Sequence, residues 1–156
     1  MEGRIAQPTD KDGKWLIPVV TTHFVPADLV YTTPSQYASF VHALMSGVGE
    51  SLAIRRLRES VSTDRKAELC VGKMAKPCPD QVGFGLGWEI VKMREKTFLM
   101  HTGLDEGVST LSYFDPGTRS GVIIFTKSAN GPSIVLPLFK LLKADRDFVA
   151  YLEKQV

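Results

Sequence analysis

The amino-acid sequence predicts an α+β protein, in which an antiparallel meander of about four strands from residue 83 onward is flanked by helices. Residues 97–126 divide into three strand-like runs separated by two short turns. Residues 83–90 alternate with period two and supply a further strand. Helical patterns lie on either side of these strands, at 33–47 and from about residue 132 to the end. Because consecutive strands with short connections pair with each other, the strands are expected to be antiparallel neighbours.

The helix predicted over 33–47 has signals at both ends. Thr33 is a favourable N-cap, Pro34 occupies the first helical position, Gln36 completes a capping box, and Gly47 provides the stop. Its apolar stripe consists of Tyr37, Phe40, Val41, Leu44 and Met45. His42 lies off this stripe and is expected in solvent, and His23 is expected in a loop.

Three further segments have helical character. A shorter helix is predicted over 51–59, with Ser51 as its cap and Leu52, Ile54 and Leu57 as its apolar residues. Its arginines, at positions 55, 56 and 58, are expected to form a solvated basic face. Residues 63–71 are expected to add one or two helical turns. In the C-terminal region the regular helix should begin near Pro137, because proline does not fit deep inside a helix.

The strands follow from alternation, apolar runs and turn residues. The first strand of 97–126 closes with His101-Thr102-Gly103, and residues 115–117 read Asp-Pro-Gly, a strong turn sequence. Residues 122–125 are β-branched or aromatic, which predicts a strand buried on both faces. The middle strand places Val108, Thr110 and Ser112 on one face and Ser109, Leu111 and Tyr113 on the other.

In 83–90, three glycines share one face of the predicted strand and Phe84, Leu86, Trp88 and Ile90 share the other. Glycine weakens a strand unless something packs closely against it. The glycine spacing is not that of a phosphate-binding loop, so no nucleotide site is expected.

Length and composition indicate how many domains the chain forms and which partners are not expected. It has 156 residues, 44% hydrophobic and 23% charged, values typical of one globular domain. We expect that domain at 31–156, after an irregular arm or linker over 1–30 that holds at most a short strand around 15–20. The net charge is +2 without a basic stripe, so no nucleic-acid partner is expected.

No apolar segment reaches the length of a membrane span, and no signal peptide opens the sequence. The chain as it stands is therefore expected in the cytoplasm, without a membrane partner or a cofactor. Cys70 and Cys78 are separated by seven residues, which is not a zinc-ligand pattern. Two unpaired thiols are the favoured interpretation, with a loop disulfide as the alternative for an exported protein.

Four motifs, in order, carry a resemblance to a known family: the helix sequence TTPSQYASFVHALMSGVG, then GFGLGW, then HTG, then FDPGTRSGVIIFTKSANG. This order resembles the C-terminal half of the serine β-lactamase-like family, which includes class C β-lactamases, penicillin-binding DD-peptidases and esterases. The resemblance covers roughly residues 27–131. It implies a partial β-lactamase-like fold, in which an antiparallel sheet is covered by helices.

The resemblance also implies a site. The family uses a Ser and a Lys from an S-x-x-K helix, a Tyr or Ser from a Y-x-N loop, and a K-T-G or H-x-G strand beside the acyl group. His101, Thr102 and Gly103 match that third element, and the backbone N–H of Leu104 would be one oxyanion donor by analogy. These four residues are the candidate catalytic positions.

The first two elements of the family site are missing. No Ser is followed three residues later by Lys, and none of the four tyrosines begins a Y-x-N. The sequence Ser128-Ala129-Asn130 matches S-x-N, but it follows the meander instead of preceding it, so we interpret it as a turn. The nucleophile and its base are therefore absent from this sequence.

Three functions remain open. The first is the C-terminal segment of a β-lactamase-like hydrolase, inactive alone, whose partner is the missing N-terminal half or a second copy. The second is a standalone, non-catalytic binding module that covers its bare surface by forming a homo-oligomer. The third is an active hydrolase that uses an unrecognised nucleophile such as Ser109 or Ser112.

Overall fold

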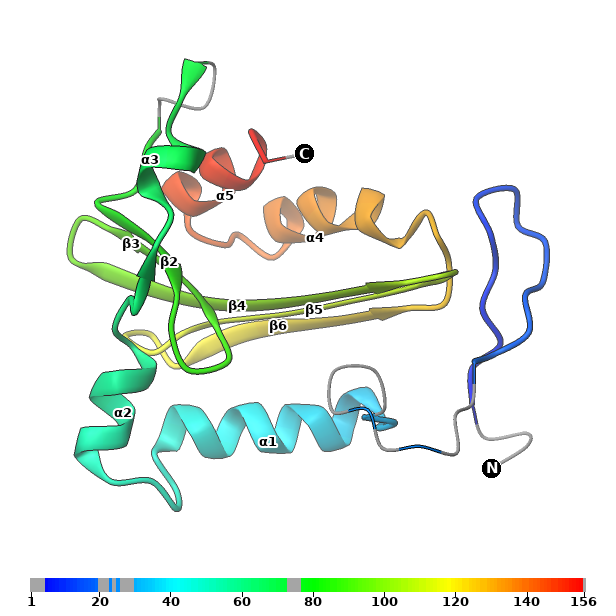
Figure 1. Cartoon of the computed structure of the whole chain (residues 1–156), viewed down its shortest axis with the longest axis horizontal. Coiled ribbons are helices and arrows are strands. Elements are labelled where there is room, and N and C mark those ends of the chain that lie inside the picture. Colours follow the sequence, from blue (N-terminus) through cyan, green and yellow to red (C-terminus); the bar gives the residue numbers. More distant parts are fainter. Residues whose placement is uncertain (1–4, 20–22, 24, 26–29, 73–76, 156) are drawn as a thin grey trace.

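A single antiparallel meander of six strands forms the centre of the protein. The computed structural model describes residues 5–19, 23, 25, 30–72 and 77–155, and each strand pairs with the next one along the chain (Figure 1). The strands are β1 (Thr63–Asp64), β2 (Gln81–Phe84), β3 (Glu89–Met93), β4 (Lys96–Asp105), β5 (Val108–Asp115) and β6 (Ser120–Thr126). The predicted α+β class is confirmed, with six strands instead of about four.

The helix α1 (Pro34–Ser46) ends where its sequence signals predict. The side chain of Thr33 accepts a hydrogen bond from the backbone N–H of Gln36, whose own side chain accepts one from the N–H of Thr33, so the capping box is complete. Gly47 has φ +67°, which suits glycine at a helix C-cap. The next helix, α2 (Leu52–Arg58), is capped by the side chain of Ser51, as predicted.

The C-terminal region contains a 3-10 helix, η2 (Gly131–Ile134), and two α-helices, α4 (Val135–Leu141) and α5 (Arg146–Leu152). Pro137 lies in the first turn of α4, where its missing N–H is tolerated, as the sequence predicts. Lys143, with φ +55°, lies in the short break between the two helices. Asp145 then caps α5 by accepting hydrogen bonds from two backbone N–H groups.

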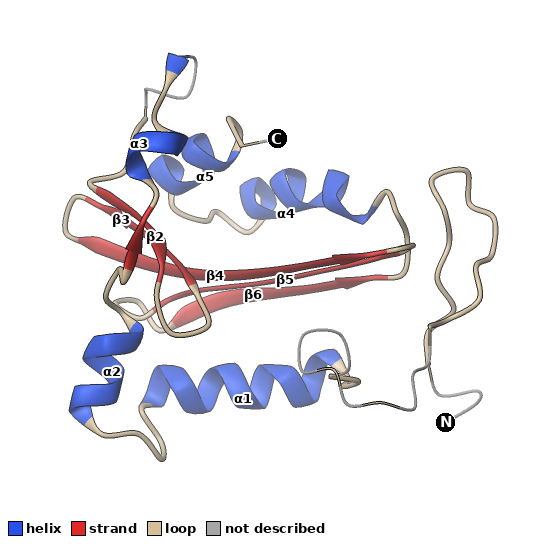
Figure 2. Ribbon diagram, viewed as in Figure 1, coloured by secondary structure: helices blue, strands red, loops and turns tan. Residues whose placement is uncertain are grey.

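Helices cover both faces of the sheet, as Figure 2 shows. The core between the sheet and α4 and α5 is the larger one, and its members include Phe98, Tyr113, Phe139 and Phe148. The opposite face carries a smaller core beneath α1, made of Val41, Trp88, Ile90, Leu99 and Phe114. The strands of the meander therefore contribute alternate side chains to two separate cores.

The prediction of one continuous strand over 83–90 is wrong. The chain reverses there, since β2 ends at Phe84 and β3 begins at Glu89. Gly87 has φ +73°, and the N–H of Gly85 donates to the carbonyl of Trp88 at 2.9 Å. Period-two alternation continues through such a reversal, so the pattern alone did not reveal the turn. The predicted close packing at glycine is correct for Gly83, where a Cβ would lie 1.9 Å from a carbonyl oxygen of β1.

The structure differs from the sequence predictions in three further places, which concern strand ends and short elements. The strand β4 continues to Asp105, so the segment 101–103 lies within it and does not close it. The segment 63–71 contains β1 and a single helix, α3 (Lys66–Leu69), because residues 63–64 pair with β2. Of the strand expected around 15–20, the described residues form only an isolated bridge between Thr9 and Trp15, and residue 20 lies outside the described part. In each place, pairing with a distant segment decides the outcome.

β6 is the last strand of the sheet, and its side chains are covered on both faces only in part. Ile124 is buried in the larger core, whereas Val122 and Ile123 are partly buried against the two cores. The prediction of a strand buried on both faces is therefore only partly correct, because β6 lies at an edge of the sheet and most of its side chains are partly buried.

Two side-chain predictions are corrected by the tertiary structure. Cys70 and Cys78 form a disulfide and are not unpaired thiols, since the loop returns their Cα atoms to within 5.7 Å. Arg58 is only 4% exposed and pairs with Glu50 and Glu59, so it does not belong to a solvated face. Arg56 remains exposed, as expected.

No helix in the described part of the chain has the length and apolar character needed to cross a bilayer.

Candidate functional site: the open edge of β4

The strand β4 is longer than its neighbour β3, and this difference creates an open edge. Pairing between the two strands ends where Glu89 lies opposite Met100. β5, on the other side, accompanies β4 as far as Asp105 opposite Val108. Residues 101–105 therefore pair with β5, whereas no described residue pairs with them on the side of β3. All four candidate residues, His101 to Leu104, lie in this segment.

The pairing register shows which backbone groups face the open side. Two-residue loops join β4 to both neighbours, so the closing pairs are Met93 with Lys96 and Asp105 with Val108. A two-residue hairpin loop closes on a pair that exchanges both backbone hydrogen bonds, and such pairs alternate along the ladder. Odd-numbered residues of β4 therefore direct their N–H and C=O toward β5. Even-numbered residues, including 102 and 104, direct theirs toward the open edge.

Two N–H groups and two carbonyls, from Thr102 and Leu104, are therefore available to an extended ligand. Leu104 is 76% exposed, so its own side chain is not packed into the protein. An edge of this kind can bind a peptide-like segment by adding it as a strand. It can equally direct one N–H at a carbonyl oxygen, the geometry of an oxyanion donor.

His101 is held in place by the turn between β2 and β3. Its Nδ1 lies 2.9 Å from the carbonyl oxygen of Gly87, and its ring meets the indole of Trp88 edge-on at 6.1 Å. Since a carbonyl can only accept, Nδ1 carries the proton, which leaves the lone pair of the neutral ring on Nε2. The imidazole is exposed at the point where the open edge begins.

Gly103 leaves the face of the sheet next to His101 without a side chain. Both residues face the α1 side of the sheet, and a Cβ at Gly103 would lie 2.6 Å from Oγ1 of Thr110. Any larger residue at this position would have to displace that hydroxyl. The third position of the H-x-G element is therefore compact for a reason visible in the structure.

The two serines suggested as nucleophiles are engaged elsewhere. Ser112 is buried, and its hydroxyl lies 3.4 Å from that of Tyr37 and 3.5 Å from the backbone carbonyl of His101. Ser109, also buried, shares a hydrogen bond of 2.9 Å with Thr126. Neither hydroxyl contacts the imidazole, so these serines lack the base that would activate them.

The S-x-N sequence is a turn, as predicted. The hydroxyl of Ser128 accepts the N–H of Asn130 at 3.2 Å, and the Asn130 amide donates to the carbonyl of Lys11. The loop therefore connects the end of the sheet to the N-terminal arm. It lies after β6, and its middle residue, Ala129, lines the same hollow as Leu104.

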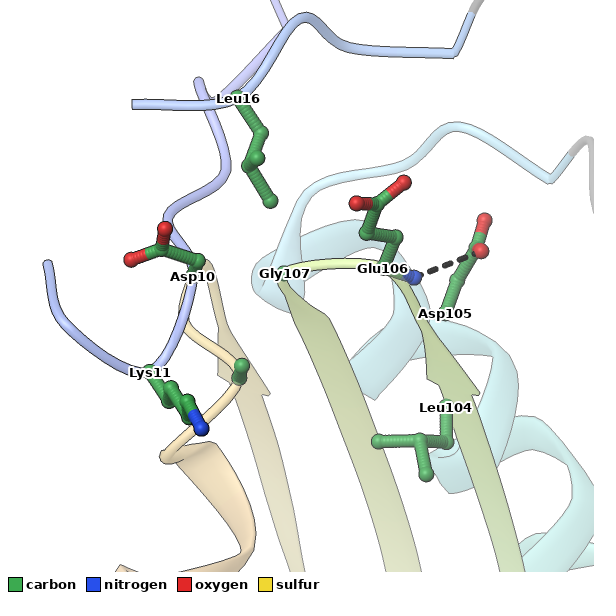
Figure 3. A pocket seen from close by; sticks show the side chains of 8 residues that line it. Asp10, Lys11, Leu16, Leu104, Asp105, Glu106 and Gly107 are labelled. Carbon is green, nitrogen blue, oxygen red and sulfur yellow. Dashed lines mark hydrogen bonds between the residues drawn. The ribbon is translucent and has the colours of Figure 1, made fainter. Parts of the chain in front are cut away.

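A hollow lies next to the far end of this edge, where the N-terminal arm passes the loop between β4 and β5 (Figure 3). Leu16 and Leu104 supply apolar side chains, while Asp10, Lys11 and Glu106 supply charges. The arm packs closely here, because a Cβ at Gly107 would meet Leu16, Pro8 and the carbonyl of Thr9 within 3 Å.

The residues at the edge offer hydrogen-bond donors and an imidazole, and no metal site accompanies them. Across the described ranges, no group of three or more His, Cys, Asp or Glu side chains is arranged to hold a metal ion. The arrangement can bind and polarise a carbonyl or carboxylate. It has no nucleophile paired with a base.

Sequence reasoning identified residues 101–104 but not what positions them. Gly87 and Trp88 hold the His101 ring, and they belong to the segment misread as a continuous strand. The signal that could have located them is the third glycine, since a positive φ is a common reason for glycine in a turn.

Comparison with known proteins gave no match: no protein-family model, curated protein or solved structure is significantly similar to this chain.

Proposed function

We propose that this chain is the C-terminal segment of a serine β-lactamase-like hydrolase, which supplies the acyl-binding edge and is inactive alone. The observation that carries the proposal is the open edge of β4, which begins at His101 and at which no described strand pairs with the outward backbone groups of Thr102 and Leu104. The resemblance to the family implies that such an H-x-G element lies beside the acyl group. The nucleophile and base would come from a polypeptide segment outside this sequence.

In this role, the N–H of Leu104 donates to the carbonyl oxygen under attack. The outward N–H and C=O of Thr102 hydrogen-bond to the acyl chain and align it. A fixed strand supplies these donors without reorganisation, which is how preorganised hydrogen bonds lower a barrier. The Nε2 of His101, whose ring is held by Gly87, is placed to accept a hydrogen bond from an N–H or O–H group of the ligand. None of these groups forms a covalent intermediate, so the chain alone performs no turnover.

Two assays test the absence of activity. The purified chain should hydrolyse neither a chromogenic β-lactam nor a chromogenic ester, and a fluorophosphonate probe should label no serine. Labelling at Ser109 or Ser112 would instead establish the chain as an active hydrolase and overturn the proposal.

A titration followed by amide NMR tests the binding edge itself. Adding benzylpenicillin or an acylated D-alanyl-D-alanine peptide should shift the amide resonances of Thr102 and Leu104. The N–H of Gly103, directed at β5, is an internal control and should shift much less. Equal shifts at all three amides, or none at millimolar ligand, would contradict the proposed use of this edge.

The alternative function is a standalone, non-catalytic binding or interaction module. It is favoured by the apolar side chains of α2, which the structure leaves exposed at Leu52, Ile54 and Leu57. Exposed apolar clusters of this kind mark interaction surfaces. Such a module predicts no selective shift at the β4 edge, so the same titration separates the two functions.

A further inference from the structure

The outer side of β6 is a second open edge, separate from that of β4. β6 pairs with β5 from Ser109 opposite Thr126 to Asp115 opposite Ser120, and no other described strand pairs with it. The register that directs odd-numbered residues of β4 toward β5 directs the odd-numbered residues of β5 toward β6. On β6 the even-numbered residues then face β5. The N–H and C=O groups of Gly121, Ile123 and Phe125 therefore point outward.

A hydrogen bond just beyond the strand supports this assignment. The carbonyl of Lys127, the next odd-numbered residue, accepts from the backbone N–H of Thr9 at 2.9 Å. Thr9 also forms a parallel bridge with Ser128. The N-terminal arm therefore occupies the edge immediately after β6. The open segment is limited to 121–125, between this contact and the turn at 116–119.

This segment lacks the features by which proteins usually protect a strand edge. It contains no charged residue, proline or bulge. Figure 1 shows α1 on one side of the sheet and α4 on the other, and the side chains of Val122 and Ile123 are partly buried against the two cores. Free backbone groups along a strand edge pair with another extended strand and not with a helix.

We propose that a second copy of this chain pairs with this edge, with the two β6 strands antiparallel about a two-fold axis at Ile123. This register places Ile123 opposite the partner's Ile123 and Gly121 opposite the partner's Phe125. Three pairs that each exchange both backbone hydrogen bonds form about six bonds in all. The register is self-complementary in size, because the smallest residue of the segment faces its largest.

Apolar side chains beside the edge extend the contact above and below the paired strands. On the α1 side, the ring of Tyr37 lies 5.6 Å from both Phe125 and Phe40, and Phe40 is 51% exposed. On the α4 side, the 56% exposed Leu142 shares a hollow with Val122. Stable interfaces bury about 800 Å² on each partner, more than five strand residues supply, so these flanking groups are needed.

The assembly should stop at two copies. A two-fold contact uses the same surface on both partners, so it closes on itself and leaves no equivalent edge for a third chain. The contact with Thr9 prevents the paired region from sliding further along the strand. This inference uses β6 alone and does not depend on the function proposed for β4.

Light scattering on the full chain, with Ile123→Pro as the variant, tests the proposal. The wild-type protein should have twice the 17.2 kDa mass of one chain. Proline is tolerated in an edge strand where its nitrogen faces outward, so Ile123→Pro should keep its circular dichroism spectrum and become monomeric. A monomeric wild type, or a folded Ile123→Pro variant that stays dimeric, would overturn the proposal.

Disulfide cross-linking gives a second readout that does not require the proline variant to fold. In the proposed register the two copies of residue 123 face each other, so Ile123→Cys should form a covalent dimer under mild oxidation. Ser120→Cys is the matched control, because position 120 lies opposite position 126 of the partner and about 20 Å from its own copy. Equal cross-linking of both variants, or none with Ile123→Cys, would exclude this register.

Discussion

Replacing Arg58 by methionine tests the buried ion pair that joins α2 to the end of α1. Nη2 of Arg58 lies 2.8 Å from Oε1 of Glu50 and 3.3 Å from the carbonyl of Leu44, and the guanidinium stands 5.8 Å from the ring centre of Phe114. Nε and Nη1 are buried without a hydrogen-bond partner among the described residues. The arginine therefore has an ionic partner, but two of its three guanidinium nitrogens lack a hydrogen bond to the described residues.

Removing one partner of a buried pair usually costs 3–5 kcal/mol, because the other charge stays buried and uncompensated. The side chain of Glu50 is only 9% exposed, but it also has Arg55 at 3.4 Å. We therefore expect Arg58→Met to lose about 3 kcal/mol, at the lower end of that range. The double variant Arg58→Met/Glu50→Gln should recover at least about 1 kcal/mol of this loss, because it also removes the stranded carboxylate.

Urea denaturation followed by tryptophan fluorescence measures these free energies, since Trp88 lies in the same core as Phe114. For a chain of this size a loss of about 3 kcal/mol lowers Tm by roughly 6–12 °C. Arg56→Met is the matched control on an exposed position of α2, and it should change stability by less than about 0.5 kcal/mol. A double variant less stable than Arg58→Met would refute the reasoning, as would equal effects of the two single substitutions.

Three further predictions concern the frame around the site. Gly83→Ala should cost roughly 1–3 kcal/mol in urea denaturation, because its Cβ would collide with the backbone of β1, and a neutral result would contradict that packing. Asp145→Ala should remove the α5 cap at a cost of about 1 kcal/mol. Although burial raises the pKa of Asp145, the hydrogen bond from Lys96 and the α5 N–H groups lower it overall, so its contribution should be present at neutral pH and disappear as the pH falls through the folded-state value. An unchanged difference between wild type and variant across an acid titration would argue against this. Replacing Cys70 and Cys78 by serine should cost about 2.5 kcal/mol through the entropy of the opened loop, and a mass unchanged by reduction and alkylation of the wild type would disprove the bond.

The candidate site shows where sequence reasoning was sufficient and where it was not. The resemblance singled out His101 to Leu104 from their residue types and order alone. Whether their backbone groups are available depends on where β3 begins, and the strand prediction for 83–90 placed no turn there. The turn at Gly87 both shortens β3 and supplies the carbonyl that holds His101. One local error in the prediction therefore concealed the feature that defines the site.

The sequence by itself determined the parts of the protein whose signals lie within a few residues. The limits of α1 follow from Thr33, Gln36 and Gly47, and the turn between β5 and β6 follows from its Asp-Pro-Gly sequence. Only the tertiary structure decided that Arg58 is buried, that the two cysteines pair, and that β4 and β6 each keep an open edge. These outcomes depend on which distant segments meet, and the free energy of such contacts is not encoded in any local pattern.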